Sequence, residues 1–297
     1  MNKPIIFVRL FIYWYGHQQF CISWAGLVSE FFSTTNGVRQ GGITSPIFFN
    51  LYMDGLSKQL KESGLGCTLN GSAYNNFMYA DDTCLLAPSP SGLQKLIDIC
   101  SRYAIKHFIL YNEKKTKCMC FLPRAMHRLY LPRVSLNTCD LLYVQCTRYL
   151  GFLICDSLSD NEDISRHIKF IYIKGNQITR KFYNCSTDVK VKLFNVFCVS
   201  IYGGHLWCNF TKARLNQAKI AYNKIFRYLF GLHGHISISM NMLVLGIDNF
   251  TVLLRKCIYN FRKRILLSCN PLIKMVTSSV FFEYSSSLNL LWRRQLF

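Results

Sequence analysis

The sequence predicts an α/β domain built on an antiparallel sheet, followed by an α-helical region. Two observations support this prediction. Around residue 80, two runs rich in β-forming residues flank a short polar turn, which indicates a β-hairpin. From residue 163 onward, apolar residues recur at helical spacing instead. Because the period changes across the acidic segment 156–163, we expect domains at 1–155 and 156–235, with a helical C-terminal region at 236–297 whose role the sequence leaves open.

The first 36 residues are apolar and aromatic. Residues 7–14 are consistent with a helix. Two apolar runs then flank Ala25-Gly26, which predicts a β-hairpin that leads the chain to Gly37. Glu30 is the only acidic residue before Asp54, so this part of the chain offers few carboxylates for catalysis.

A glycine-rich loop follows at residues 37–42 and contains Arg39, Gln40 and Gly41. Its backbone can pass close to a ligand, because glycine has no Cβ. Pro46 suits the first turn of a helix with Ser45 as its N-cap. An ordinary loop and helix cap is the alternative, but the aspartate turn downstream favours a loop that faces a substrate.

The predicted hairpin spans residues 74–87, is expected at the centre of the sheet, and carries Asp81 and Asp82 at its turn. Two adjacent carboxylates repel each other, so ionising both is costly unless a cation neutralises them. Mg²⁺ usually takes one or two carboxylates and completes its shell with water and substrate phosphates. The alternative is a solvated turn, since aspartate is a common turn residue. Asp81 and Asp82 are therefore candidate metal ligands.

Downstream of the turn, the pattern predicts a helix over 91–106, capped by Ser91 with Gln94. Strands at 107–111 and 117–122 would flank a turn that carries Lys115, which is either a triphosphate contact or part of a solvated basic turn. A further hairpin is expected from Tyr143 to Ile154. In the helical region, Thr187-Asp188 would cap one helix and Gly231 would end the next.

The chain carries a formal net charge of +20. Residues 165–297 contain twenty Lys and Arg residues against three acids, whereas residues 1–100 contain six of each. An uneven basic excess of this kind favours a polyanionic partner, which binds mainly through counterion release.

Fourteen cysteines in a chain of this length, without a signal peptide, are typical of free core thiols in a reducing compartment. We therefore expect no disulfide-linked partner and an intracellular location, in the nucleus or the cytoplasm. The apolar stretch at residues 5–15 is interrupted by Arg9 and is too short to span a bilayer, so no membrane partner is expected.

Several motifs resemble those of reverse transcriptases, in particular non-LTR (LINE-type) retrotransposons. They are the Tyr79-Ala80-Asp81-Asp82 turn, the Arg39-Gln40-Gly41-Gly42 loop with its following helix, Asn112-Glu113-Lys114-Lys115-Thr116, Tyr149-Leu150-Gly151-Phe152 and Tyr202-Gly203-Gly204-His205-Leu206-Trp207. The resemblance implies a polymerase palm followed by a thumb-like helical region.

The same resemblance implies an RNA-directed DNA polymerase that uses an RNA template, a DNA primer and deoxynucleotide triphosphates. Asp81 and Asp82 would be the catalytic ligands of two Mg²⁺ ions, Arg39, Gln40, Gly41 and Lys115 would bind nucleotide or template, and Tyr149, Leu150 and Gly151 would form the primer grip. The family also uses a third carboxylate on an upstream strand, and nothing in this sequence matches it. We therefore expect an N-terminally truncated polymerase with impaired activity. A catalytically inactive nucleic-acid-binding protein and a decayed remnant are the alternatives.

Overall fold

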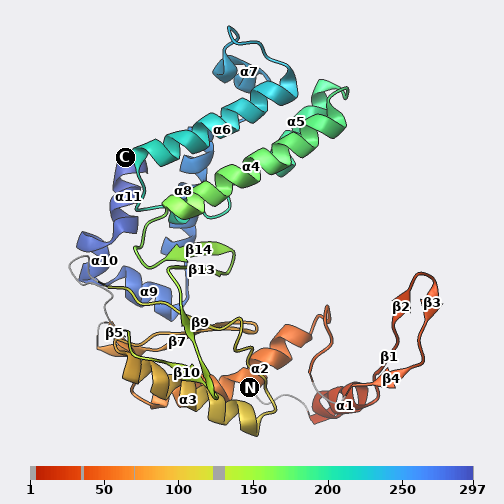
Figure 1. Cartoon of the computed structure of the whole chain (residues 1–297), viewed down its shortest axis with the longest axis vertical. Coiled ribbons are helices and arrows are strands. Elements are labelled where there is room, and N and C mark those ends of the chain that lie inside the picture. Colours follow the sequence, from red (N-terminus) through yellow and green to blue (C-terminus); the bar gives the residue numbers. More distant parts are fainter. Residues whose placement is uncertain (1–4, 35–36, 70, 123–130, 297) are drawn as a thin grey trace.

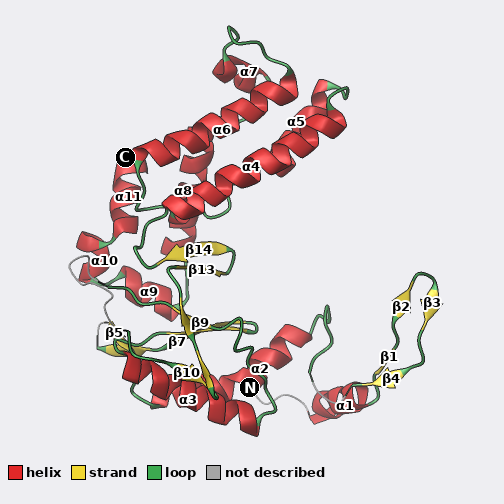
Figure 2. Ribbon diagram, viewed as in Figure 1, coloured by secondary structure: helices red, strands yellow, loops and turns green. Residues whose placement is uncertain are grey.

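The computed structural model describes residues 5–34, 37–69, 71–122 and 131–296. Figure 1 shows an elongated molecule with the α/β elements at one end and the long helices at the other. Figure 2 shows that the strands are short and that helices make up most of the ordered structure.

An N-terminal arm projects from the α/β part (Figure 1). It contains helix α1 (Ile5–Gly16) and strands β1 (Gln19–Phe20), β2 (Ser23–Trp24), β3 (Leu27–Val28) and β4 (Phe32–Ser33). This confirms the predicted helix and hairpin, whose turn has positive φ at Ala25 and Gly26. No residue of α1 is buried. The ring of Phe11 packs on that of Phe48 with centroids 5.0 Å apart.

Two helices form the base of the α/β part, α2 (Ser45–Glu62) and α3 (Pro90–Lys106). They bury a shared core of Met53, Leu56, Leu60, Leu96, Cys100 and Tyr103. Ser45 is the first residue of α2, not its N-cap as predicted. Its hydroxyl instead donates a 2.6 Å hydrogen bond to the carbonyl of Arg39 and so ties the glycine-rich loop to the helix.

Helix α3 ends at Lys106 as predicted, but its N-cap and the segment after it differ from the prediction. Ser89, rather than Ser91, caps the helix by accepting a hydrogen bond from the amide of Gly92. The predicted strand after the helix is absent, because the amide of Ile109 bonds back to the carbonyl of Ala104 and Phe108 takes a φ of +53°. This Schellman-type ending turns the chain away from the helix axis.

The remaining strands of the α/β part are short. They are β5 (Cys67–Leu69), β6 (Ser72–Tyr74), β7 (Asn76–Tyr79), β8 (Asp82–Leu85), β9 (Lys117–Cys118), β10 (Ser135–Leu136), β11 (Cys139–Asp140), β12 (Leu142–Tyr143), β13 (Cys146–Tyr149) and β14 (Phe152–Cys155).

Among the described residues, every strand pairs with one partner only, so the ladders are two-stranded. The β7–β8 hairpin therefore does not lie at the centre of a larger sheet, which corrects our expectation. Met78 and Leu85 pack instead against the α2–α3 core. Helix packing of this kind stabilises a hairpin that would be marginal by itself.

The structure pairs Cys146 with Cys155 in a disulfide, which corrects the expectation that all cysteines are free. The two residues are direct partners in the antiparallel register of β13 and β14, with Cα atoms 4.1 Å apart. Directly opposite residues project from the same face of a ladder, so the hairpin itself brings the two sulfurs together. The other cysteines are free thiols.

The helical region contains α4 (Asn161–Phe182), α5 (Thr187–Phe197), the 3₁₀ helix η1 (Gly204–Leu206), α6 (Lys212–Phe230), α7 (Ile238–Val244), α8 (Phe250–Leu266), α9 (Pro271–Thr277), α10 (Val280–Ser285) and α11 (Ser287–Leu296). Gly231 ends α6 with a φ of +64°, as predicted. Thr187-Asp188 does not cap α5 as predicted, because Thr187 is already its first residue and Ser186 takes the N-cap position without a side-chain hydrogen bond. One hydrophobic core runs from Ile164 to Trp292, so it shows no break at the boundary predicted near residue 235. In the described part of the chain, no helix is long and apolar enough to cross a bilayer.

Candidate active site

The turn that joins β7 to β8 holds two carboxylates at the tip of a hairpin. Tyr79 and Asp82 form the last pair of the ladder, and Ala80 takes a φ of +50° to reverse the chain. Asp81 and Asp82 are both exposed. Within the described residues, neither carboxylate has a hydrogen bond or an ion pair. The turn therefore presents two free anionic groups to solvent.

Asn75 holds the base of this hairpin against α2. Its side chain is 2% exposed, and its amide nitrogen donates to the carbonyls of Leu60 and Leu65 at 2.5 Å and 2.8 Å. The amide of Leu86 donates to the carbonyl of Asn75 at 2.8 Å, which extends the pairing of the hairpin by one step. The exposed turn is thus supported by a buried polar network, as a precise metal or substrate site requires.

The second hairpin, β13–β14, turns at Leu150-Gly151, whose φ angles are +47° and +83°. Tyr202 covers this turn. Its hydroxyl donates a 2.9 Å hydrogen bond to the carbonyl of Leu150, and its ring stacks on that of Phe152 with centroids 5.1 Å apart. A Cβ added at Gly151 would lie 2.8 Å from the Tyr202 ring, so glycine is required for both the turn and the contact.

The two hairpins approach each other at Tyr149. Burial raises the pKa of the Tyr149 hydroxyl, and the nearby Cys84 thiol and Asp82 carboxylate raise it further. Tyr149, the first of the predicted primer-grip residues, therefore lies within electrostatic range of Asp82 in the aspartate turn. The tyrosine remains a neutral hydrogen-bonding group at physiological pH.

The glycine-rich loop is folded onto the start of α2. The carbonyl of Arg39 accepts from the amide of Gly42 and from the Ser45 hydroxyl, and Gly41 has a φ of +78°. The side chains of Arg39 and Gln40 are exposed. No hydrogen bond or ion pair joins them to Asp81 or Asp82 among the described residues.

Lys115 lies in the turn at residues 112–116, as the sequence predicts. Asn112 shapes this turn, because both its carbonyl and its side-chain oxygen accept hydrogen bonds from the amide of Lys115, at 3.1 Å and 3.0 Å. The Lys115 side chain is exposed and has no acidic partner in the described chain. It is not bonded to the aspartate turn, so its role in binding a triphosphate stays a prediction.

The chemistry of the aspartate turn fits a magnesium ion. Asp81 and Asp82 supply the one or two free carboxylates that Mg²⁺ takes from a protein when phosphates and water complete its shell. No group of three or more His, Cys, Asp or Glu side chains placed to hold a metal occurs in the described ranges. The residues therefore fit an ion shared with a substrate better than a closed protein site.

Sequence reasoning missed the contacts through which Asp163 joins the second hairpin to the helical region. Asp163 is 3% exposed. One oxygen accepts from the amide of Leu153 and from Arg166, and the other accepts from the indole of Trp207. The sequence signal that could have revealed this role is helical spacing. Asp163 recurs at that spacing with His167 and Ile171, which places it on the buried face of α4.

A family model described as reverse transcriptase (RNA-dependent DNA polymerase) matches residues 6–154 of this chain. Over 73 residues the chain is 42% identical to the Pol polyprotein from type-2 retrotransposable element R2DM of Drosophila melanogaster, covering 25% of this chain and 7% of that protein. Over 150 residues it is 28% identical to the Pol polyprotein from type-1 retrotransposable element R1 2 of Nasonia vitripennis, covering 48% and 34%. The aligned segments thus span about a third or less of these curated relatives. The family match covers half of the chain and includes both hairpins, and the chain therefore belongs to the reverse transcriptase (RNA-dependent DNA polymerase) family.

Proposed function

We propose that this chain acts as part of an RNA-directed DNA polymerase of a retrotransposon, with Asp81 and Asp82 as its metal-binding carboxylates. The observation that carries the proposal is the pair of exposed, unpartnered carboxylates on a supported hairpin turn, with Tyr149 of the second hairpin close to Asp82. Mg²⁺ held there would neutralise charge on the transferring phosphate. Asp81 would be the direct ligand, and Asp82 would lie beside it.

The remaining roles follow from the position of each group. Arg39 and Gln40 would contact template or nucleotide from the glycine-rich loop, and Lys115 would reach a triphosphate as a mobile point charge. The Leu150-Gly151 turn would hold the primer end, and helices α4 to α6 would form the thumb-like region. RNA template, DNA primer and deoxynucleotide triphosphates are the proposed substrates.

The 297-residue polypeptide is proposed to be impaired by itself. Two metal ions need enough anionic ligands to offset their mutual repulsion. Asp54 and Glu30 are poorly suited to help, because Asp54 is ion-paired with Lys58 at 2.7 Å and Glu30 lies on the N-terminal arm. Electrostatic stabilisation is often the largest catalytic contribution, so two carboxylates are expected to support little turnover.

Primer extension on a primed RNA template with Mg²⁺ tests both parts of the proposal. The chain alone should extend the primer no better than its Asp81→Ala variant. A longer polypeptide that adds an upstream palm strand with an aspartate should extend the primer. In that polypeptide Asp81→Ala should abolish extension, whereas the control Asp140→Ala, at an exposed residue, should not. Insensitivity of the longer polypeptide to Asp81→Ala would refute the catalytic assignment. Robust extension by the 297-residue chain would refute the impairment.

A second candidate function is nucleic-acid binding without catalysis. It is favoured by the charge of residues 165–297, which contain twenty basic and three acidic residues. If this candidate is right, nucleic-acid affinity persists while the longer polypeptide shows no extension that depends on Asp81.

A further inference from the structure

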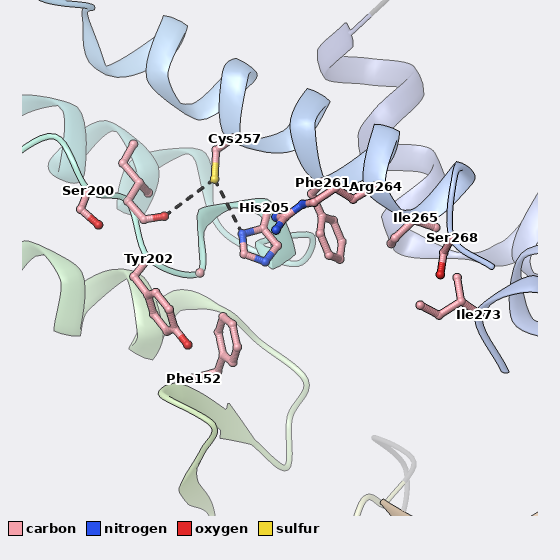
Figure 3. A pocket seen from close by; sticks show the side chains of 12 residues that line it. Phe152, Ser200, Tyr202, His205, Cys257, Phe261, Arg264, Ile265, Ser268 and Ile273 are labelled. Atoms are coloured by element: carbon pink, nitrogen blue, oxygen red, sulfur yellow. Dashed lines mark hydrogen bonds between the residues drawn. The ribbon is translucent and has the colours of Figure 1, made fainter. Parts of the chain in front are cut away.

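A pocket of about 760 Å³ lies behind the turn of the second hairpin. Figure 3 shows the side chains that line it, which come from β14, from the loop at residues 200–205, and from α8 and the segment after it. Ligand pockets of this order of size hold molecules as large as a nucleotide. The aspartate turn is not part of its lining.

Aromatic rings form a continuous row along this pocket. Tyr202 stacks on Phe152 with an angle of 19° between the rings, and the Tyr202 side chain is still 55% exposed. The Phe152 ring meets the His205 ring edge-on with centroids 6.0 Å apart, and the rings of His205 and Phe261 are 4.4 Å apart. Exposed aromatic surface that faces a concave site is the usual platform for an unpaired nucleobase.

Arg264 adds a cation to these rings. Its guanidinium carbon lies 6.0 Å from the centre of the Phe261 ring, and the side chain has no acidic partner in the described parts of the chain. No acidic residue lines the pocket. The pocket therefore offers a free positive charge that an anionic ligand can neutralise.

His205 contributes a neutral ring rather than a second charge. Burial lowers the pKa of His205, and the neighbouring Arg264 lowers it further. The thiol of Cys257 contacts Nδ1 of this ring at 3.7 Å and the carbonyl of Ile201 at 3.8 Å (Figure 3), which holds the imidazole in place on the pocket wall.

We infer that this pocket binds one unpaired nucleotide of a single-stranded nucleic acid, with its base stacked on the aromatic rings and its phosphate facing Arg264. The inference rests on the proposed nucleic-acid partner and adds a binding site separate from the aspartate turn. A base inside a duplex is already stacked on its neighbours, so the pocket selects single-stranded segments.

The test uses the full chain and two probes, a short single-stranded RNA that carries one 2-aminopurine and a blunt RNA duplex. Phe261→Leu and Arg264→Gln each remove one recognition element. Lys263→Gln is the matched control, because Lys263 is an exposed cation next to Arg264 on α8 that does not line the pocket. Equilibrium affinity and 2-aminopurine quenching are measured at one low salt concentration without nucleotides or metal.

Wild-type protein should bind the single strand and quench 2-aminopurine. Phe261→Leu and Arg264→Gln should weaken single-strand binding by about fivefold or more, reduce the quenching and lower the preference for single strand over duplex. Lys263→Gln should change the affinities for the single strand and for the duplex by the same factor. Equal effects of Arg264→Gln and Lys263→Gln, with no effect of Phe261→Leu, would overturn the pocket while leaving the nucleic-acid partner in place. Absence of any binding by the wild type would overturn the pocket and the proposed partner together.

Discussion

The indole nitrogen of Trp207 donates a 2.9 Å hydrogen bond to Oδ2 of Asp163, and both residues are almost fully buried. Oδ1 of the same carboxylate accepts from Arg166 and from the backbone amide of Leu153. One buried charge therefore connects α4, the loop after η1 and strand β14. This arrangement fixes the second hairpin, and with it the turn at Gly151, relative to the helical region.

Replacing Asp163 by Asn should destabilise the protein by about 3 kcal/mol, because an amide cannot accept from Arg166 and Trp207 as the carboxylate does and leaves buried donors unpaired. Trp207→Phe should cost less, about 1–2 kcal/mol for the lost hydrogen bond. The control is Asp140→Asn, whose partner Arg133 is exposed and whose loss should cost less than about 1 kcal/mol. Urea unfolding gives these values, and equal costs for Asp163→Asn and Asp140→Asn would contradict the role assigned to Asp163.

Stability should fall as the pH drops from about 6.5 toward about 4, and His167 should account for part of that loss. Burial lowers the pKa of His167 from 6.5 to about 4. Between these values the unfolded chain binds a proton that the folded chain does not, so acid favours unfolding there, by up to roughly 3 kcal/mol. The difference between wild type and His167→Gln in thermal unfolding over this range isolates the effect. A difference that does not change with pH would rule it out.

Gly151→Ala should destabilise the second hairpin more than Gly231→Ala destabilises the end of α6. Both glycines have positive φ, but an added Cβ meets the Tyr202 ring at 2.8 Å only at position 151, whereas nothing lies within 4 Å at position 231. The backbone strain, of order 1 kcal/mol, is common to both, so the excess measures the contact with Tyr202. Equal free energies of unfolding for the two variants would show that Tyr202 moves away at no cost.

Local patterns in the sequence predicted the hairpin at Asp81-Asp82, the turn at Lys115 and the helical structure of the chain from residue 163 onward. Each of these depends on neighbours in the chain, such as a positive-φ residue at a turn or apolar residues at helical spacing. The errors arose where distant segments decide the outcome. Gln94 bonds the backbone of Ser135 instead of completing a capping box, which leaves Ser89 as the cap.

The candidate site shows the same difference between features set by neighbouring residues and features set by distant ones. Exposure of Asp81 and Asp82 follows from their place in a turn. The proximity of Tyr149 to Asp82 and the hydrogen bond from Trp207 to Asp163 join residues separated by tens of positions. No periodicity in a single sequence encodes these contacts.

Nucleic-acid affinity should decrease steeply with salt. Each phosphate contact releases counterions, so the affinity should drop by at least about tenfold between roughly 50 and 200 mM salt. Lys224→Gln, in the basic region, should reduce the slope of log affinity against log salt by nearly one, because one phosphate contact is lost. Lys95→Gln, at an exposed residue of the neutral segment 1–100, should leave it unchanged. An affinity independent of salt would exclude binding through phosphate neutralisation.

Divalent ions should bind weakly at the aspartate turn even without substrate. Asp81 and Asp82 are exposed and unpartnered in the described chain, whereas Asp54 is neutralised by Lys58 at 2.7 Å. A cation relieves the repulsion between the two adjacent carboxylates, so Mn²⁺, used as a paramagnetic substitute for Mg²⁺, should bind the wild type and bind Asp81→Asn severalfold more weakly. Asp54→Asn should bind as the wild type does, because the paired carboxylate of Asp54 offers little to a cation. Mn²⁺-dependent water relaxation measures the affinity directly and is independent of any polymerase activity. If Asp54→Asn lowered the affinity as much as Asp81→Asn, the ion would lie between α2 and the turn, and Asp54 would be a further metal ligand.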